Sequence, residues 1–162
     1  MNVKNLKTYI LLGIVLIIAD QVSKHLFFNF LKTQPFGSIS ILPFFNLTLV
    51  INKGVSFGFL NSIPHPEYII SFIAICITCF LLFLFIKETS VIKKTALVLL
   101  ISGAIGNTID RFIYGGVIDF LDFHINNLHY PAFNIADSII FIGILILLFP
   151  NFFKKMLRLK SL

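Results

Sequence analysis

The sequence predicts an all-α membrane protein with four transmembrane helices and a small extracytoplasmic β-layer between the first two helices. The 162-residue chain is 57% hydrophobic and 12% charged, and its mean hydropathy is +0.96. Soluble domains carry about 25% charged residues. Four apolar runs approach 20 residues, the length that crosses a hydrocarbon core of about 30 Å. A β-branched stretch separates the first two runs. We expect one domain spanning 1–162.

The first apolar run, residues 9–30, predicts a membrane helix. Lys4 and Lys7 precede it, which also fits the start of a signal peptide. However, no small-x-small cleavage site follows the run. Asp20 and Lys24 come instead, four residues apart on one helix face. We therefore expect a retained helix, in which this pair has a structural role.

The connection from 31 to 67 predicts the β-layer. Residues 46–52 combine β-branched and apolar side chains, as a strand does, and residues 38–42 can pair with them. Asn52-Lys53-Gly54 is a turn signal. We expect this layer to lie on the outer membrane surface, with four phenylalanines facing lipid or helices: Phe44, Phe45, Phe57 and Phe59.

Three further runs predict helices at 68–86, 95–111 and 133–153. The second run carries no charge, and its Cys76 and Cys79 are expected as small apolar residues rather than a redox pair. Gly103 and Gly106 in the third run have no side chains, which indicates close packing of this helix against its neighbours. We expect a short outer loop to join the third and fourth helices, so that they run antiparallel.

The charge distribution predicts the orientation. With four spans, nine of the 13 cations fall on one side, and six of the seven acids fall toward the other. Because Lys and Arg concentrate in cytoplasmic loops, we expect both termini in the cytoplasm and the chemistry at the outer face. The net charge of +6 then reflects membrane orientation rather than nucleic-acid binding.

Four of the seven acids fall between 110 and 137, beside membrane helices. Asp137 opens the fourth helix, where a carboxylate is favoured, and Asp119 follows Gly115-Gly116. They can meet as a catalytic carboxyl pair. Alternatively, Asp137 serves the helix dipole and Asp119 bonds nearby amides. We prefer Asp119 to Asp122 because Val117-Ile118 can anchor it.

Other polar residues leave alternatives open. Asn107 shares a helix face with Asp110 and with Arg111, which predicts a structural Asp110 and a ligand-facing Arg111. His124 and His129 leave a metal-dependent hydrolase as an alternative function, but no HExxH motif is present. A transporter would use Asp20, Lys24 and Asp110, yet the sequence has no inverted repeat.

The chain resembles the bacterial lipoprotein signal peptidases, the signal peptidase II family, over nearly its whole length. The resemblance rests on five motifs in order: Asp20-Gln21 with Lys24, Asn52-Lys53-Gly54 with Phe57-Gly58, Gly106-Asn107 with Asp110-Arg111, Val117-Ile118-Asp119-Phe120, and Phe133-Asn134 with Ala136-Asp137. The pair Gly115-Gly116 departs mildly from the family, in which one glycine and a variable residue are expected.

The resemblance implies an aspartyl intramembrane endopeptidase without a metal or cofactor. It places the catalytic aspartates at Asp119 and Asp137. The substrate-lining residues it implies are Asn52, Gly54, Asn107, Arg111 and Asn134. It further implies a monomer in the bacterial inner membrane, a β-cradle on the outer surface, and prolipoprotein substrates cut just before a diacylglyceryl-modified cysteine.

Overall fold

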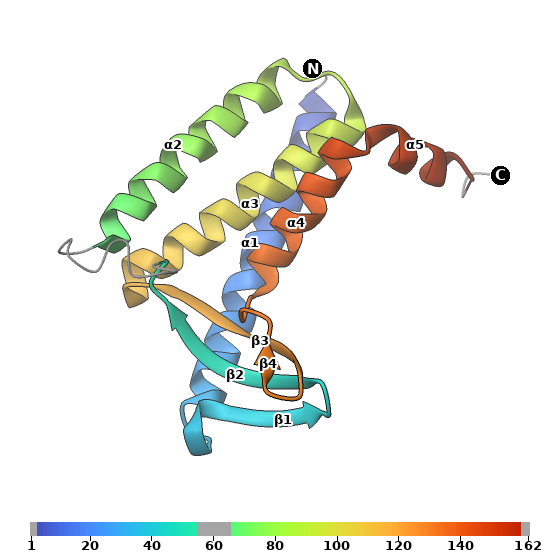
Figure 1. Ribbon diagram of the computed structural model, residues 1–162. Coiled ribbons are helices and arrows are strands. Elements are labelled where there is room, and N and C mark those ends of the chain that lie inside the picture. Colours follow the sequence, from blue (N-terminus) through green and yellow to red (C-terminus); the bar gives the residue numbers. More distant parts are fainter. Residues whose placement is uncertain (1–2, 55–65, 160–162) are drawn as a thin grey trace.

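The computed structural model describes residues 3–54 and 66–159. A bundle of helices stands on a small β-sheet at one end (Figure 1). The helices are α1 (Val3–Leu31), the 3₁₀ turn η1 (Pro35–Gly37), α2 (Pro66–Lys87), α3 (Val91–Tyr114), α4 (Ile135–Leu148) and α5 (Pro150–Leu159). The strands are β1 (Ser38–Leu42), β2 (Phe45–Asn52), β3 (Val117–Ile125) and β4 (Leu128–His129). The expected Phe57-Gly58 and Phe59 fall outside the described residues.

Helix α3 is the centre of the bundle and packs against α1, α2 and α4. Glycines allow this close approach, as the sequence predicts. A Cβ on Gly103 would lie 2.6 Å from the Ala136 carbonyl oxygen on α4. A Cβ on Gly106 would lie 2.5 Å from Asp20 Oδ2 on α1. These contacts bring polar groups of three helices to one level of the bundle.

The sheet joins two distant parts of the chain. Its strand order is β1-β2-β3-β4, and each neighbouring pair is antiparallel. The expected pairing of 38–42 with the following strand is confirmed. The expectation of a layer built only between the first two helices is wrong, as is that of a short loop after α3. Residues 117–125 are rich in β-branched and aromatic side chains, and they extend the sheet as β3.

An apolar cluster fixes the sheet to the end of α1. Leu31, Ile118 and Phe120 are buried there, with at most 1% of their surfaces exposed. The rings of Phe27 and Phe120 stack with centroids 4.4 Å apart. Because Ile118 and Phe120 are held in this way, the residue between them, Asp119, has a fixed place on the opposite face of β3.

The fourth helix is shorter than the sequence predicts. The structure ends α4 at Leu148, and α5 leaves it at an angle of 96°. Pro150 has no N–H to continue the helical hydrogen bonds, and proline fits the first position of a new helix. In the described part of the chain, three helices are long and apolar enough to cross a membrane, with a fourth crossing if α4 and α5 count as one bent span.

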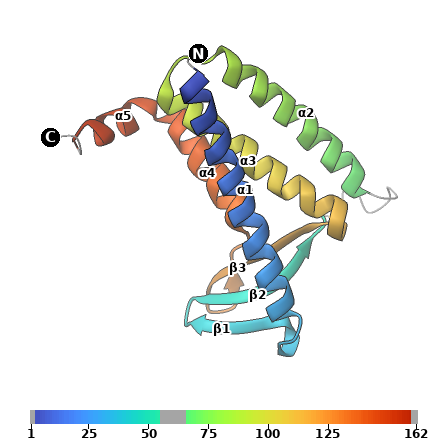
Figure 2. The ribbon, with the colours of Figure 1, turned by 180° about the vertical axis from the view of Figure 1, so that it is seen from behind.

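Both described ends of the chain lie away from the sheet. The start of α1, the α2–α3 connection and α5 gather at the opposite end of the bundle, as both views show (Figures 1 and 2). This end therefore carries the lysine clusters that predict the cytoplasmic side. The structure does not describe the side chains of Lys4, Arg158 and Lys160.

Candidate active site

Asp119 is held by two side-chain amides. It lies on β3 opposite Val50 of β2, and only 1% of its surface is exposed. Asn52 Nδ2 donates to its Oδ2 across 2.9 Å, and Asn134 Nδ2 donates to its Oδ1 across 2.6 Å. Both carboxylate oxygens thus have a neutral donor, and within 3–54 and 66–159 neither has a lysine or arginine ion-pair partner.

Asp137 stands in the first turn of α4 and belongs to a capping box. Its backbone N–H donates to Asn134 Oδ1 across 2.9 Å, and the Asn134 backbone N–H donates to Asp137 Oδ2 across 3.3 Å. The cap leaves the Asn134 amide nitrogen free to reach Asp119. Asn134, fully buried, therefore bonds to both carboxyl-bearing residues.

Asn107 on α3 completes this arrangement. Its Nδ2 donates to Asp137 Oδ1 across 2.7 Å. Its Oδ1 accepts from Lys24 Nζ at 2.9 Å and from Asn134 Nδ2 at 3.3 Å. Because a cation occupies the oxygen, the amide must point its NH₂ group toward Asp137.

A buried ion cluster, formed by Asp20, Lys24 and Asp110, adjoins the site. Lys24 Nζ lies 2.9 Å from Asp20 Oδ2 and 2.9 Å from Asp110 Oδ2, and all three side chains are at most 2% exposed. Asp20 also accepts from the Ala136 backbone N–H and Asp110 from that of Ile118. A buried charge requires an oppositely charged partner and hydrogen bonds of this kind. The cluster thereby joins α1 and α3 to the starts of α4 and β3.

Gln21 is a member of this cluster to which the sequence analysis assigns no role beyond its place in the first motif. Its Nε2 donates to Asp20 Oδ2, to the Gly106 carbonyl and to Asp110 Oδ1, at 3.2, 3.1 and 2.9 Å. The available signal is a polar amide inside an otherwise apolar membrane helix, where polar groups face a partner.

The two aspartates of β3 differ in their electrostatics. Burial raises the pKa of the Asp119 carboxyl from 3.8 to about 6, and the negative charge of Asp137 adds to this, against the hydrogen bonds from Asn52 and Asn134. Burial also acts on Asp122, but hydrogen bonds from His129, Thr48 and Asn46 outweigh it and hold its pKa below the ordinary value. The Asp119 carboxyl therefore keeps its proton to a higher pH than the Asp122 carboxyl does.

Asp122 belongs to a separate cluster. Its Oδ1 lies 2.8 Å from His129 Nδ1, and its Oδ2 accepts from Thr48 Oγ1 and Asn46 Nδ2 at 3.1 and 3.4 Å. An odd spacing along a strand places Asp119 and Asp122 on opposite faces. The structure therefore brings Asp119, not Asp122, to Asp137.

The two remaining expected site residues, Gly54 and Arg111, flank the carboxyl pair. Gly54 has a φ of +75°, and its N–H donates to Asn52 Oδ1 at 2.8 Å, which turns the Asn52 NH₂ group toward Asp119. Arg111 Nη1 donates to the Asn107 carbonyl at 2.9 Å. Its Nε is buried and has no hydrogen-bond partner among the described residues, so it can still donate to a ligand.

The histidines considered for a metal lie near Asp122. The rings of His124 and His129 stack with centroids 4.9 Å apart. Across 3–54 and 66–159, no three His, Cys, Asp or Glu side chains come together as a metal site needs. Cys76 and Cys79 are free and exposed on the apolar helix α2.

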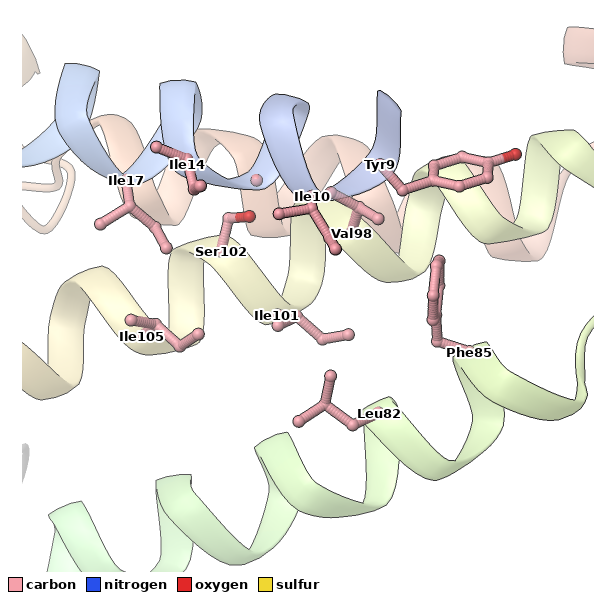
Figure 3. Close-up of a pocket in the computed structure, with 11 residues that line it drawn as sticks. Tyr9, Ile10, Ile14, Ile17, Leu82, Phe85, Val98, Ile101, Ser102 and Ile105 are labelled. Carbon is pink, nitrogen blue, oxygen red and sulfur yellow. The ribbon is translucent and has the colours of Figure 1, made fainter. Parts of the chain in front are cut away.

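An apolar pocket of about 200 Å³ opens elsewhere, between α1, α2 and α3. Figure 3 shows isoleucine and valine side chains lining it, with the rings of Tyr9 and Phe85 close together at one end. These two rings meet edge to face with centroids 5.4 Å apart. None of the carboxylates discussed above lines this pocket, so it has no part in acid–base chemistry.

The carboxyl pair therefore has what general acid–base catalysis requires. One carboxyl has a raised pKa, the other stands at a helix N-terminus, and asparagine amides orient both. Residues 12–153 match the family described as "Signal peptidase (SPase) II".

Individual relatives and solved structures are also similar. A lipoprotein signal peptidase of Thermodesulfovibrio yellowstonii is 44% identical over 93% of this chain and 98% of that protein. One of Francisella tularensis subsp. novicida is 41% identical over 91% and 92%. The structure of a bacterial membrane enzyme at 2.3 Å resolution is 32% identical, with a TM-score of 0.75 over 92% of this chain and 90% of its own.

Proposed function

Because this chain belongs to the signal peptidase II family and is therefore a membrane-embedded protease, we propose a specific reaction for it. It removes the signal peptide from prolipoproteins, cutting just before a cysteine that carries a diacylglyceryl group. Asp119 and Asp137 activate the attacking water. The observation that carries this proposal is the Asn134 side chain, which bonds to both residues at once.

The electrostatics favour one distribution of the shared proton. Two close carboxyls resist double ionisation, so one of them holds a proton. Asp119 is the buried partner with the raised pKa, whereas Asp137 accepts from backbone and side-chain N–H groups at a helix N-terminus. In this proposal Asp119, whose pKa is raised, holds the shared proton when substrate binds, and Asp137 acts as the base.

Each carboxyl then has one task. Asp137 takes a proton from water as the water oxygen bonds to the scissile carbonyl carbon. Asp119 donates its proton to the carbonyl oxygen, which stabilises the developing charge. As the tetrahedral intermediate collapses and its C–N bond breaks, Asp137 gives the proton it took from water to the leaving nitrogen. Asp119 recovers a proton from a hydroxyl of the intermediate, so both carboxyls return to their starting states. One product is the signal peptide, which now ends in a free carboxyl group. The other begins with the lipidated cysteine, which now has a free amino group. No metal or cofactor takes part.

The surrounding residues orient this reaction. Asn52, Asn107 and Asn134 fix the carboxyls by their amide NH₂ groups. Arg111 offers its spare donors to a substrate carbonyl or lipid headgroup. Gly54 allows the close approach of α2 to the turn after β2, because a Cβ there would lie 2.6 Å from Ile70 Cδ1. All these residues come from one chain, so a monomer suffices.

The same proposal includes the orientation in the membrane. α1, α2, α3 and α4 are the four spans, and the sheet lies on the outer surface of the bacterial inner membrane. Both termini are cytoplasmic, because the end of the bundle opposite the sheet carries the lysine-rich clusters. The lipid of the substrate can then remain in the bilayer while its peptide bond reaches Asp119 and Asp137.

The test is cleavage by the purified chain in vesicles. A lipid-modified prolipoprotein should yield a product whose first residue is the lipidated cysteine, as mass spectrometry reports, and the unlipidated substrate should be cut poorly. Asp137→Asn should abolish cleavage, and EDTA should not. Cleavage at another bond, a fully active Asp137→Asn variant, or recovery of EDTA-treated enzyme by zinc would contradict the proposal.

A further inference from the structure

Helix α5 is the one helix of the described structure that leaves the bundle. It bends away from α4 by 96° and extends outward at the end opposite the sheet (Figures 1 and 2). α4 runs alongside α3, which is a membrane-crossing helix. A helix nearly perpendicular to a membrane-crossing helix lies roughly in the plane of the membrane. The geometry of the bend therefore places α5 parallel to a membrane surface.

The length of α4 places α5 at the boundary of the hydrocarbon core. The 14 residues of α4 extend about 21 Å at 1.5 Å per residue. The core is about 30 Å thick, so α4 falls short by about 9 Å. An interfacial amphipathic helix buries its apolar face by about 5–10 Å. An α5 at that depth accounts for the difference.

The side chains of α5 divide in the way such a position requires. Phe152 and Met156 are four residues apart, which puts them on one helix face, and they are 65% and 39% exposed. Asn151, Lys154 and Lys155 are exposed as well. The segment from 150 to 162 contains four cations and no acid. This charge is complementary to anionic lipid headgroups.

Two other positions for α5 fit these residues less well. If α5 continued the span, Lys154 and Lys155 would enter the hydrocarbon, where a charged side chain is costly. If α5 projected into water, the ring of Phe152 would face the solvent, next to Phe149, which is 57% exposed. Only a position in the interface satisfies both kinds of side chain.

We propose that α5 is a membrane-surface anchor that binds anionic phospholipids of the leaflet at the end opposite the sheet. Lys154 and Lys155 contact the headgroup phosphates, and Phe152 and Met156 enter the acyl boundary. This anchor fixes the height of α4 in the bilayer. It is independent of the peptidase chemistry.

The first experiment measures the depth of the two faces of α5. Polarity-sensitive fluorophores are attached to Met156→Cys or Asn151→Cys in full-length chains that lack Cys76 and Cys79. The chains are reconstituted in phosphatidylcholine vesicles containing about one-third phosphatidylglycerol. We expect blue-shifted emission at 156 and several-fold weaker quenching by aqueous iodide than at 151. Equal quenching at the two positions, strong or weak, would overturn the proposal.

The second experiment tests the lipid charge. The variant Lys154→Gln/Lys155→Gln should lower the ratio of immersed to free α5 by about 30-fold, from the attraction lost per lysine. The control Lys87→Gln/Lys93→Gln removes equal charge from the end of α2 and the start of α3 and should leave the ratio unchanged. In pure phosphatidylcholine the two variants should behave alike. Equal loss in both variants, or no effect of phosphatidylglycerol, would refute the role of these lysines.

Discussion

The side-chain amide of Asn134 donates a 2.6 Å hydrogen bond to the Asp119 carboxyl. The oxygen of the same amide accepts the N–H of Asp137, so that the cap of α4 sets the direction of the bond. A helix cap thus orients a candidate catalytic carboxyl on a neighbouring strand. The cap and the bond to this carboxyl use different atoms of one side chain, so substitutions can separate stability from the proposed catalysis.

Substitutions of Asn134 should separate the cap from the bond to Asp119. Asn134→Ser retains an N-cap oxygen, and serine caps helices about as well as asparagine. It cannot reach Asp119 with an NH₂ group. We expect Asn134→Ser to melt close to the parent but to lose about 10²-fold in kcat. Asn134→Ala should lose a similar activity and about 1 kcal/mol of stability as well. Equal kcat for parent and Asn134→Ser would remove Asn134 from the mechanism.

The choice between the aspartates of β3 has an equally direct test. Asp119→Asn should lower kcat by about 10²–10⁴-fold, the range of a lost acid or base, without loss of stability. Asp122→Asn should retain most of the activity, because its carboxyl contacts His129 and Thr48 instead. It should lower the melting temperature by weakening these contacts. The reverse result, an inactive Asp122→Asn beside an active Asp119→Asn, would show that the wrong aspartate is assigned.

The raised pKa of Asp119 predicts how stability depends on pH. The native pKa of about 6 exceeds the ordinary 3.8, so the native state binds the extra proton between these values. The contribution of Asp119 to the free energy of unfolding should therefore be greatest below about pH 4 and fall as pH rises through 6, by about 3 kcal/mol.

Melting in detergent over this range measures the effect. Asp119→Asn is the matched variant, and its stability should be nearly flat where that of the parent falls. The pKa of Asp122 is lowered, so its contribution is present above 3.8 and is lost only below that value, outside the window. An equal slope in parent and Asp119→Asn would contradict the assignment.

Removal of Lys24 should be strongly destabilising. Lys24→Met leaves Asp20 and Asp110 buried without their cation, and breaking a buried ion pair costs about 3–5 kcal/mol. The exposed Lys32 is the control, and Lys32→Met should change stability by no more than about 0.5 kcal/mol. Because Lys24 also holds Asn107 Oδ1, residual activity should fall further than the folded fraction does. A folded fraction that accounts for all the lost activity would limit Lys24 to a structural role.

Two glycines facing the bundle should respond differently to alanine. A Cβ at Gly103 would lie 2.6 Å from a backbone oxygen of α4, which cannot move without shifting the helix. A Cβ at Gly13 would meet the Ser102 hydroxyl at 3.3 Å, which a small adjustment relieves. We expect Gly103→Ala to cost about 1–3 kcal/mol and Gly13→Ala much less. Similar melting temperatures for both variants would disprove the close α3–α4 contact.

Much of the fold follows from the sequence because its signals are local. The apolar runs predict α1, α2 and α3, and the pattern of 46–52 predicts β2. The end of α4 is less evident. Apolar residues continue past Pro150 to Phe153, and membrane helices tolerate proline when other groups satisfy the freed backbone. Periodicity alone cannot distinguish a kinked span from a helix that ends.

The candidate site shows the same limit. Asn52 and Asp119 are separated by 67 positions along the chain. Their contact depends on the register of β2 against β3, including the irregularity between Leu47 and Val50. One residue of slip would turn Asp119 to the other face. Residue types and helix faces predict which side chains take part, but only the paired strands determine which amide meets which carboxyl.

The strand pairing also sets a temporal order. Asn52 is synthesised early, but its carboxyl partner on β3 and the Asn134 cap emerge only after α3 has been made. Domains commonly fold in the order of synthesis. Here the nascent chain cannot complete the two-carboxyl arrangement until the start of α4 has left the ribosome and joined α1. A half-inserted chain therefore lacks the paired carboxyls, and under the proposed mechanism peptide cleavage must await the last bundle helix.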